Sequence, residues 1–158
     1  MRDLETIGWW PYWGYPFLAF NLLAAGRRDM TDAAVVRAFI ERINAHDVDG
    51  IAAALTPDHR FTDSLGTVFT GREALRKGWR GYFALVADYH ITVGELLEGP
   101  SGVVLVGQAA GRSGGETWRV PAAWRAVVRD NQVAEWQVYA DNEPLRASLR
   151  RAPKVSGG

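Results

Sequence analysis

Two carboxylates, Asp63 and Asp141, are the residues of this sequence best placed for chemistry. Asp63 stands in the stretch 61–66, between the apolar residues Phe61 and Leu65. A carboxylate at the inward end of a strand is costly to bury unless it has partners or a task. Two interpretations are open for Asp63. It caps the turn at 64–66, or it faces a pocket and removes a proton from a bound compound.

Asp141 stands at the end of the last predicted strand, just before Pro144 breaks that strand. It is a candidate for returning a proton, and the alternative is a cap on the C-terminal turn. Strand alternation places Asp141 and Tyr139 on the face opposite Trp136 and Val138.

The remaining reactive residue types add little. The sequence contains no cysteine, which excludes disulfides and thiol catalysis. His46 is expected at a helix end, while His59 and His90 are expected at the starts of strands as rim or surface groups. No zinc-binding spacing or phosphate-binding loop is evident, so no metal and no cofactor are expected.

Three helices are predicted to position these groups. The first begins at Thr31, a capping residue, and ends near His46; the second ends before Pro57; the third spans 72–87. Helical spacing gives the first an apolar stripe of Val35, Val36, Phe39, Ile40 and Ile43. The third carries Leu75, Trp79, Tyr82, Phe83 and Val86 at the same spacing, a core-type stripe whose Trp79 and Tyr82 could also line a cavity.

Strands follow the helices. They are predicted at 59–65, 89–97, 103–110, 116–128 and 133–141, with a loop at 66–71 and a short helix at 145–151. Gly107 indicates a bulge or bend within its strand. Helices followed by strands predict an α+β fold, in which a curved antiparallel sheet forms a cone-shaped barrel wrapped over three N-terminal helices.

The chain divides into an aromatic N-terminal arm at 1–30, one domain at 31–147 and a flexible tail at 148–158. Trp9, Trp10, Trp13 and Phe17 give the arm a large apolar surface, while its prolines and glycines oppose a membrane span. We expect the arm to cover the cavity mouth or a second subunit; a mobile start and an interfacial anchor are the alternatives. The 18 basic and 18 acidic residues balance, so no nucleic-acid partner is expected. A cytoplasmic location is expected.

Three segments carry a family resemblance: VVRAFIERINAHDVDGIAAALTPDHRFTDSLG at 35–66, GREALRKGWRGYF at 71–83 and AEWQVYADNEPL at 134–145. They resemble the nuclear transport factor 2-like superfamily, and within it the ketosteroid isomerases and the SnoaL-like polyketide cyclases. The resemblance covers about residues 31–147. It implies a cone with an apolar cavity, and a homodimer formed through the outer face of the sheet.

The resemblance also assigns roles. The general-base Asp of the isomerases falls at Asp63, but Phe39 stands at the position of their oxyanion-hole Tyr and Ala123 at that of their protonated Asp. Without those two donors a developing oxyanion lacks its stabilisers, so steroid isomerisation is not expected. The acid/base Asp of the cyclases falls at Asp141. Limonene epoxide hydrolases use an Arg and an Asp where this chain has Gln108 and Ala110.

Two functions are therefore carried forward. The first is a cofactor-independent lyase, isomerase or cyclase acting on a small hydrophobic carbonyl compound, with Asp63 and Asp141 as catalytic residues. The second is a non-catalytic module of the same fold that binds a hydrophobic ligand or dimerises. A buried Asp63 with a pKa near neutrality favours the enzyme, and an Asp63 held by Arg125 or by backbone amides favours the binding module. The expected substrate-binding residues are Phe39, Phe61, Trp79, Tyr82, Phe83, Ala123, Trp136 and Tyr139.

Overall fold

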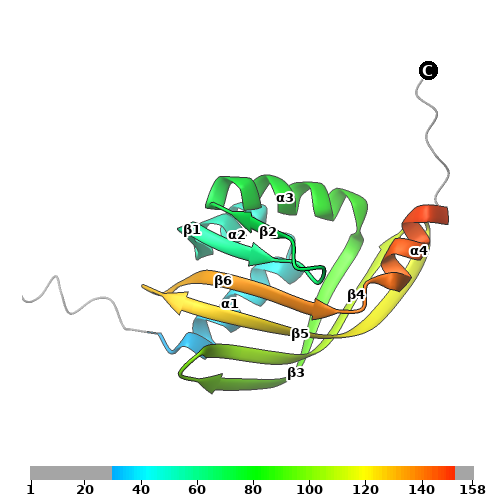
Figure 1. Ribbon diagram of the computed structural model, residues 1–158. Helices are drawn as coiled ribbons and strands as arrows, with labels where there is room; N and C mark the ends of the chain where they lie inside the picture. The colour runs from blue at the N-terminus through cyan, green and yellow to red at the C-terminus, as the bar shows by residue number, and fades with distance from the viewer. Residues whose placement is uncertain (1–29, 152–158) are drawn as a thin grey trace, which may run out of the picture.

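The computed structural model describes residues 30–151 of the chain, which form helices packed on one face of a six-stranded sheet (Figure 1). The elements are α1 (Asp32–Asn44), α2 (Val48–Ala54), β1 (Leu55–Thr62), β2 (Val68–Thr70), α3 (Arg72–Leu85), β3 (Ala87–Gly99), β4 (Gly102–Ser113), β5 (Glu116–Arg129), β6 (Gln132–Ala140) and α4 (Glu143–Arg151). The predicted α+β class is confirmed. The aromatic arm through residue 29 and the tail from residue 152 lie outside the described residues, and residues 148–151 belong to α4.

The sheet is curved and open, with the strand order β2-β1-β6-β5-β4-β3 (Figure 1). Neighbouring strands are antiparallel except β1 and β6, which run parallel. The predicted antiparallel sheet is therefore wrong at this one pairing. The strands from β3 to β6 follow one another through tight turns, which require antiparallel neighbours, whereas the long segment 63–131 separates β1 from β6.

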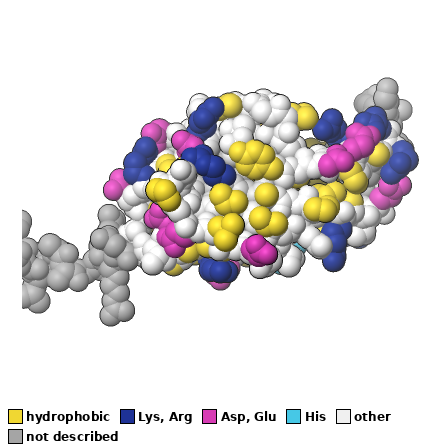
Figure 2. Space-filling view, turned by 60° about the horizontal axis from the view of Figure 1, so that its bottom comes forward, with side chains coloured by type: hydrophobic (Ala, Val, Ile, Leu, Met, Phe, Trp, Pro, Cys, Tyr) yellow, Lys and Arg dark blue, Asp and Glu magenta, His cyan; other side chains and the backbone are white. Residues whose placement is uncertain are grey.

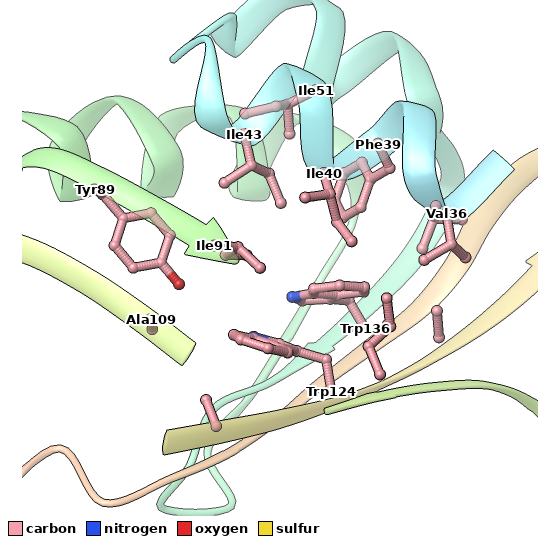
Figure 3. Packing of buried hydrophobic residues seen from close by; sticks show 14 of the residues in the cluster. Val36, Phe39, Ile40, Ile43, Ile51, Tyr89, Ile91, Ala109, Trp124 and Trp136 are labelled. Carbon is pink, nitrogen blue, oxygen red and sulfur yellow. The ribbon is translucent and has the colours of Figure 1, made fainter. Parts of the chain in front are cut away.

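Helix α1 forms as its sequence predicts. The Thr31 hydroxyl accepts a hydrogen bond from the amide of Ala34 at 3.2 Å, and Asp32 lies in the first turn, where a negative charge is favoured. Its apolar stripe packs against the sheet. Figure 3 shows Phe39 and Ile40 above Trp136, with Trp124 in the layer beneath, and the Phe39 and Trp136 rings meet edge to face at 5.2 Å. This half of the interior is filled.

Strand β1 begins earlier than predicted and contains an irregularity. It starts at Leu55, directly at the end of α2, instead of at His59. Its register pairs Leu55 with Val133 and next Arg60 with Glu135, so β1 carries extra residues between these two pairs. The irregularity sets the later register, in which Phe61 pairs with Trp136 and lies on the same face of the sheet.

His59 lies inside this irregular stretch and is buried, contrary to the predicted rim or surface position. Only 1% of it is exposed, and its Nδ1 donates to the carbonyl oxygen of Val133 on β6 at 2.8 Å. Burial lowers the pKa of His59, although Asp58 and Glu135 oppose that shift. The ring is therefore neutral at neutral pH and links the two parallel strands.

Gly107 marks a close approach between strands β4 and β3. A Cβ at this position would lie 2.0 Å from the carbonyl oxygen of Thr92, so only glycine fits without a shift of the backbone. The register changes on the opposite strand, between Val93 and Glu95. The sequence located the irregularity correctly, but the extra residue belongs to β3.

Candidate functional site

A cavity of about 350 Å³ opens between α3, the inner face of the sheet and α4. Seven of its 17 lining residues are aromatic: Phe61, Phe69, Trp79, Tyr82, Tyr89, Trp118 and Trp136. The side chains of Asp63, Ser64 and Asn142 are its other polar groups, and Leu145 of α4 also lines it. An apolar cavity with a few polar groups is the usual form of a small-molecule site.

Helix α3 supplies one wall of this cavity. Trp79 and Tyr82 project from it at helical spacing, with their rings edge to face at 6.0 Å. Trp79 also lies 6.4 Å from the ring of Tyr89 on β3. Trp79 and Tyr82 are half-buried, because they face the cavity instead of a packed core.

Asp63 joins the two interpretations given by the sequence, since it is a turn residue and also lines the cavity. Its Oδ1 accepts hydrogen bonds from the backbone amides of Leu65 and Thr67, both at 2.8 Å. Among residues 30–151, no group donates to its second oxygen, Oδ2. The carboxylate is thus held by backbone amides, the arrangement that favours the binding module.

Arg125 does not approach Asp63. It faces the outer side of the sheet, where it pairs with Glu135 at 3.0 Å and donates to the carbonyl oxygen of Ser101 at 2.9 Å. This outcome follows from the alternation of β5, in which Trp124 and Ala126 point inward.

Asp141 is exposed and is not among the residues that line the cavity. Its Oδ1 accepts from the amide of Glu143 at 2.9 Å, at the start of α4. This is the capping role that the sequence left open. The next residue, Asn142, does reach the cavity, where its Nδ2 donates to the Ser64 hydroxyl at 2.7 Å. That bond joins the β1–β2 turn to the beginning of α4.

The eight predicted substrate-binding residues fall into three groups. Phe61, Trp79, Tyr82 and Trp136 line the cavity. Phe39 lies in the packed half of the interior, and Phe83 packs between Trp79 and the His46 ring, on which it stacks at 4.2 Å. Ala123 and Tyr139 lie on the outer face of the sheet, Tyr139 with 51% of its surface exposed. The structure therefore brings half of these residues together around Asp63.

Sequence reasoning missed several cavity residues, among them the aromatic residues Phe69, Tyr89 and Trp118. Trp118 is part of the cavity wall, with its ring 6.3 Å from that of Tyr89. Alternation of inward residues along β5 was the available signal, since Trp118, Trp124 and Ala126 share one face. Alternation alone does not say which inward residues meet empty space.

Among the described residues, no group of three or more His, Asp or Glu side chains is arranged to hold a metal ion. Within 30–151, no helix is both long and apolar enough to cross a membrane.

Comparison with known protein families identifies the fold. The profile of the SnoaL-like domain matches residues 36–136, which is well over half of the chain. The chain belongs to the SnoaL-like domain family. None of the curated proteins matches this SnoaL-like chain.

Solved structures agree with this assignment. The putative SnoaL-like polyketide cyclase from Shewanella putrefaciens CN-32 is 15% identical, with a TM-score of 0.68 over 78% of this chain and 98% of its own. A hypothetical protein with a ketosteroid isomerase-like fold from Catenulispora acidiphila DSM 44928, solved in complex with trimethylamine, is 18% identical, with a TM-score of 0.67 over 73% of this chain and 92% of its own.

A third structural relative is an epoxide hydrolase similar to limonene epoxide hydrolases, from M. tuberculosis. It is 19% identical, with a TM-score of 0.67 over 79% of this chain and 94% of its own. At such identities the similarity establishes the SnoaL-like fold and leaves the reaction to be argued from the site.

Proposed function

We propose that this SnoaL-like protein binds a small hydrophobic compound in the cavity beneath α3. The aromatic cavity itself carries the proposal, since its volume of about 350 Å³ lies at the small end of the range of ~300–1,000 Å³ usual for small-molecule pockets. The polar groups at its edge, Asp63, Ser64 and Asn142, are few and suit the orientation of one bound compound. Binding leads over catalysis because two backbone amides hold Asp63 in its turn.

Proton transfer by Asp63 is the second candidate, and it is supported by the unpartnered Oδ2 described above. That oxygen would take a proton from the carbon next to a carbonyl group, and the C–H electron pair would move to form an enolate. The new carboxylic acid would then return the proton to the same carbon or to another one. Because Asp141 lies outside the cavity, Asp63 is the better candidate for both steps.

One ketone tests both candidates. The compound 2-tetralone is small and apolar, and it has exchangeable C–H protons between its ring and its carbonyl. Binding is measured by isothermal titration calorimetry, and we expect saturable heat for the wild-type protein. If the protein takes up neither this ketone nor its hydrocarbon analogue tetralin, the binding proposal is wrong.

Deuterium exchange of the same ketone in D₂O, followed by NMR, tests the chemistry. Asp63→Asn keeps an oxygen for the amides of Leu65 and Thr67 but removes the base, whereas Asp63→Ala also removes the turn contact. If Asp63 is catalytic, Asp63→Asn lowers protein-dependent exchange by about 100-fold or more while binding persists. Exchange equal to that in buffer alone, with wild-type protein that binds the ketone, leaves the protein a binding module.

We also propose that a second copy of the chain covers the outer face of the sheet. Figure 2 shows hydrophobic side chains gathered in the middle of that face, with charged side chains mostly around them. By strand register, the exposed residues Val104, Val106 and Tyr139 lie on this outer face. Tyr139→Glu should convert a dimer to a monomer in light scattering after size-exclusion chromatography, whereas the same change at Leu65, exposed on the β1–β2 turn, should not. A wild-type monomer at all concentrations excludes this arrangement.

A further inference from the structure

The described part of the cavity wall carries one negative charge and no positive charge. Among the described residues that line the cavity, Asp63 is the only carboxylate, and none is a lysine, an arginine or a histidine. The other titratable side chains of the wall are the phenols of Tyr82 and Tyr89. Burial raises the pKa of both phenols, so they are neutral at neutral pH. The wall is therefore negative as a whole.

The negative charge of Asp63 has no counterion within the described chain. None of the ion pairs within residues 30–151 includes Asp63, and Arg125 faces the outer side of the sheet. The backbone amides of Leu65 and Thr67 bind only Oδ1. Because Asp63 is only half-buried, its second oxygen, Oδ2, remains available to a partner from outside the chain.

The turn that holds Asp63 joins two aromatic residues of the cavity wall. Phe61 of β1 and Phe69 of β2 pair across the two strands, with their rings 6.0 Å apart, and Phe61 also pairs with Trp136 of β6. All three side chains line the cavity. Asp63 follows β1 directly, so the carboxylate and this aromatic surface belong to the same part of the wall.

The rest of the aromatic wall offers ring surface to a ligand. The rings of Trp79 and Tyr82 lie at 86° to each other, and those of Tyr82 and Tyr89 at 84°, so the faces of neighbouring rings point in different directions. The Nε1 atom of Trp118 is buried and does not reach the open cavity. The face of an aromatic ring attracts a cation, most strongly when the ring is an indole. The rings and the carboxylate thus favour the same sign of charge on a ligand.

We propose that the cavity binds a small hydrophobic amine in its protonated form, with the ammonium nitrogen beside Asp63 and the hydrocarbon body against the aromatic rings. This assignment rests on the proposed binding function and names the class of ligand. A charge in an apolar site is costly unless it is paired. An ammonium ion pairs with the carboxylate, whereas a carboxylic acid ligand is repelled by it and a neutral hydrocarbon leaves it unpaired.

The test compares 2-aminotetralin, a cation at neutral pH, with tetralin, which has the same two-ring skeleton and no charge. Calorimetry gives dissociation constants for the wild-type protein, Asp63→Asn and the matched control Asp130→Asn, which removes the same charge from an exposed turn outside the cavity. The wild-type protein should bind the amine roughly tenfold or more tightly than tetralin, the size expected for cation–π contacts and one charged hydrogen bond. Asp63→Asn should remove most of this difference, and Asp130→Asn should keep it.

A second readout uses the unmodified protein. The amides of Leu65 and Thr67 donate to Asp63, so their signals in a ¹⁵N–¹H spectrum should shift more with 2-aminotetralin than with tetralin. This measurement decides the matter if Asp63→Asn fails to fold. If the wild-type protein binds none of tetralin, 2-tetralone and 2-aminotetralin, the proposed function fails and this inference fails with it. If tetralin and 2-aminotetralin bind with equal affinity, or if neither Asp63→Asn nor the amide signals distinguish them, the function stands and the assignment of an amine is wrong.

Discussion

Helices α1 and α3 carry apolar stripes of the same period but meet different interiors. Val36, Phe39 and Ile43 of α1 are at most 1% exposed, whereas Leu75 is the only fully buried residue of α3, and its aromatic residues are half-buried. Helix α1 packs on Trp124 and Trp136, and α3 faces the cavity. An amphipathic stripe therefore identifies the inward face of a helix, but it does not show whether side chains fill the space beyond that face.

Residue type explains part of this difference. The α1 stripe is largely aliphatic and Phe, which pack without polar atoms, whereas the α3 stripe holds Trp79 and Tyr82, whose polar tips need access to a partner. Gly78 lines the cavity between them, and a Cβ placed there would meet no atom within 4 Å. The cavity therefore exists partly because Gly78 of α3 has no side chain to occupy it.

The largest expected effect belongs to the filled half. Phe39→Ala should lower the free energy of unfolding by ~3–5 kcal/mol, because it removes a buried ring and leaves a void. Urea unfolding followed by circular dichroism measures this, with Leu65→Ala on an exposed turn as a control expected to change stability by less than about 0.5 kcal/mol. A small loss for Phe39→Ala would mean that this half is not tightly packed.

Truncation of a side chain in the half of the interior that contains the cavity should lower the free energy of unfolding less. Trp79→Ala removes a larger side chain, but one that already borders empty space, so we expect a loss of ~1–2 kcal/mol. The affinity for 2-tetralone should fall more than stability does. If Trp79→Ala destabilises the protein as much as Phe39→Ala, the two halves do not differ in the way described.

A larger side chain placed in the cavity tests the same difference between the two halves of the interior. Gly78→Leu should abolish binding of 2-tetralone while raising stability by up to about 1 kcal/mol, since leucine favours helix more than glycine does. Gly81→Leu is the matched control, because Gly81 also lies in α3 with open space around it but does not line the cavity. It should gain similar stability and keep wild-type affinity. Equal affinities in the two variants would place the ligand elsewhere.

The smallest effect should appear only as a dependence on pH. The pKa of His59 is lowered in the folded protein by burial, so the unfolded chain binds this proton first as the pH falls. The stability associated with neutral His59 is complete above about pH 6.5, the ordinary histidine value, and is lost as the pH falls toward the folded pKa. Urea midpoints at pH 7.5 to 5 measure it, and His59→Gln should flatten this part of the profile. An unchanged slope in that variant would assign the dependence to other groups.

Much of the fold followed from the sequence because its signals are local. Thr31 starts a helix as predicted, and alternation correctly placed Tyr139 on the face of β6 opposite Trp136 and Val138. The start of β1 was wrong because Pro57 resembled the end of a helix, although the strand already begins at Leu55. Local patterns do not report such a direct passage from helix to strand.

The site was predicted less completely than the fold. Asp63 and Trp79 were found because their residue types are unusual at inward positions, but Trp118 was missed, since a strand pattern cannot separate a filled interior from a hollow one. Ala123 was included on family resemblance, although alternation along β5 places it on the outer face, where it pairs with Tyr139. Where resemblance and alternation disagreed, alternation gave the correct position.

The parallel pairing of β1 with β6 has a consequence for how the protein is made. β1 leaves the ribosome early, but its partner is complete only when Ala140 has been added. At the usual ~5–20 residues per second, the strand waits several seconds with only the short β2 beside it. During that time Phe61 and Phe39 lack Trp136, the β6 residue that both of them adjoin in the folded protein. The domain therefore closes late, in a step that joins its first strand to its last, and a nascent chain interrupted before β6 would expose a surface prone to aggregation.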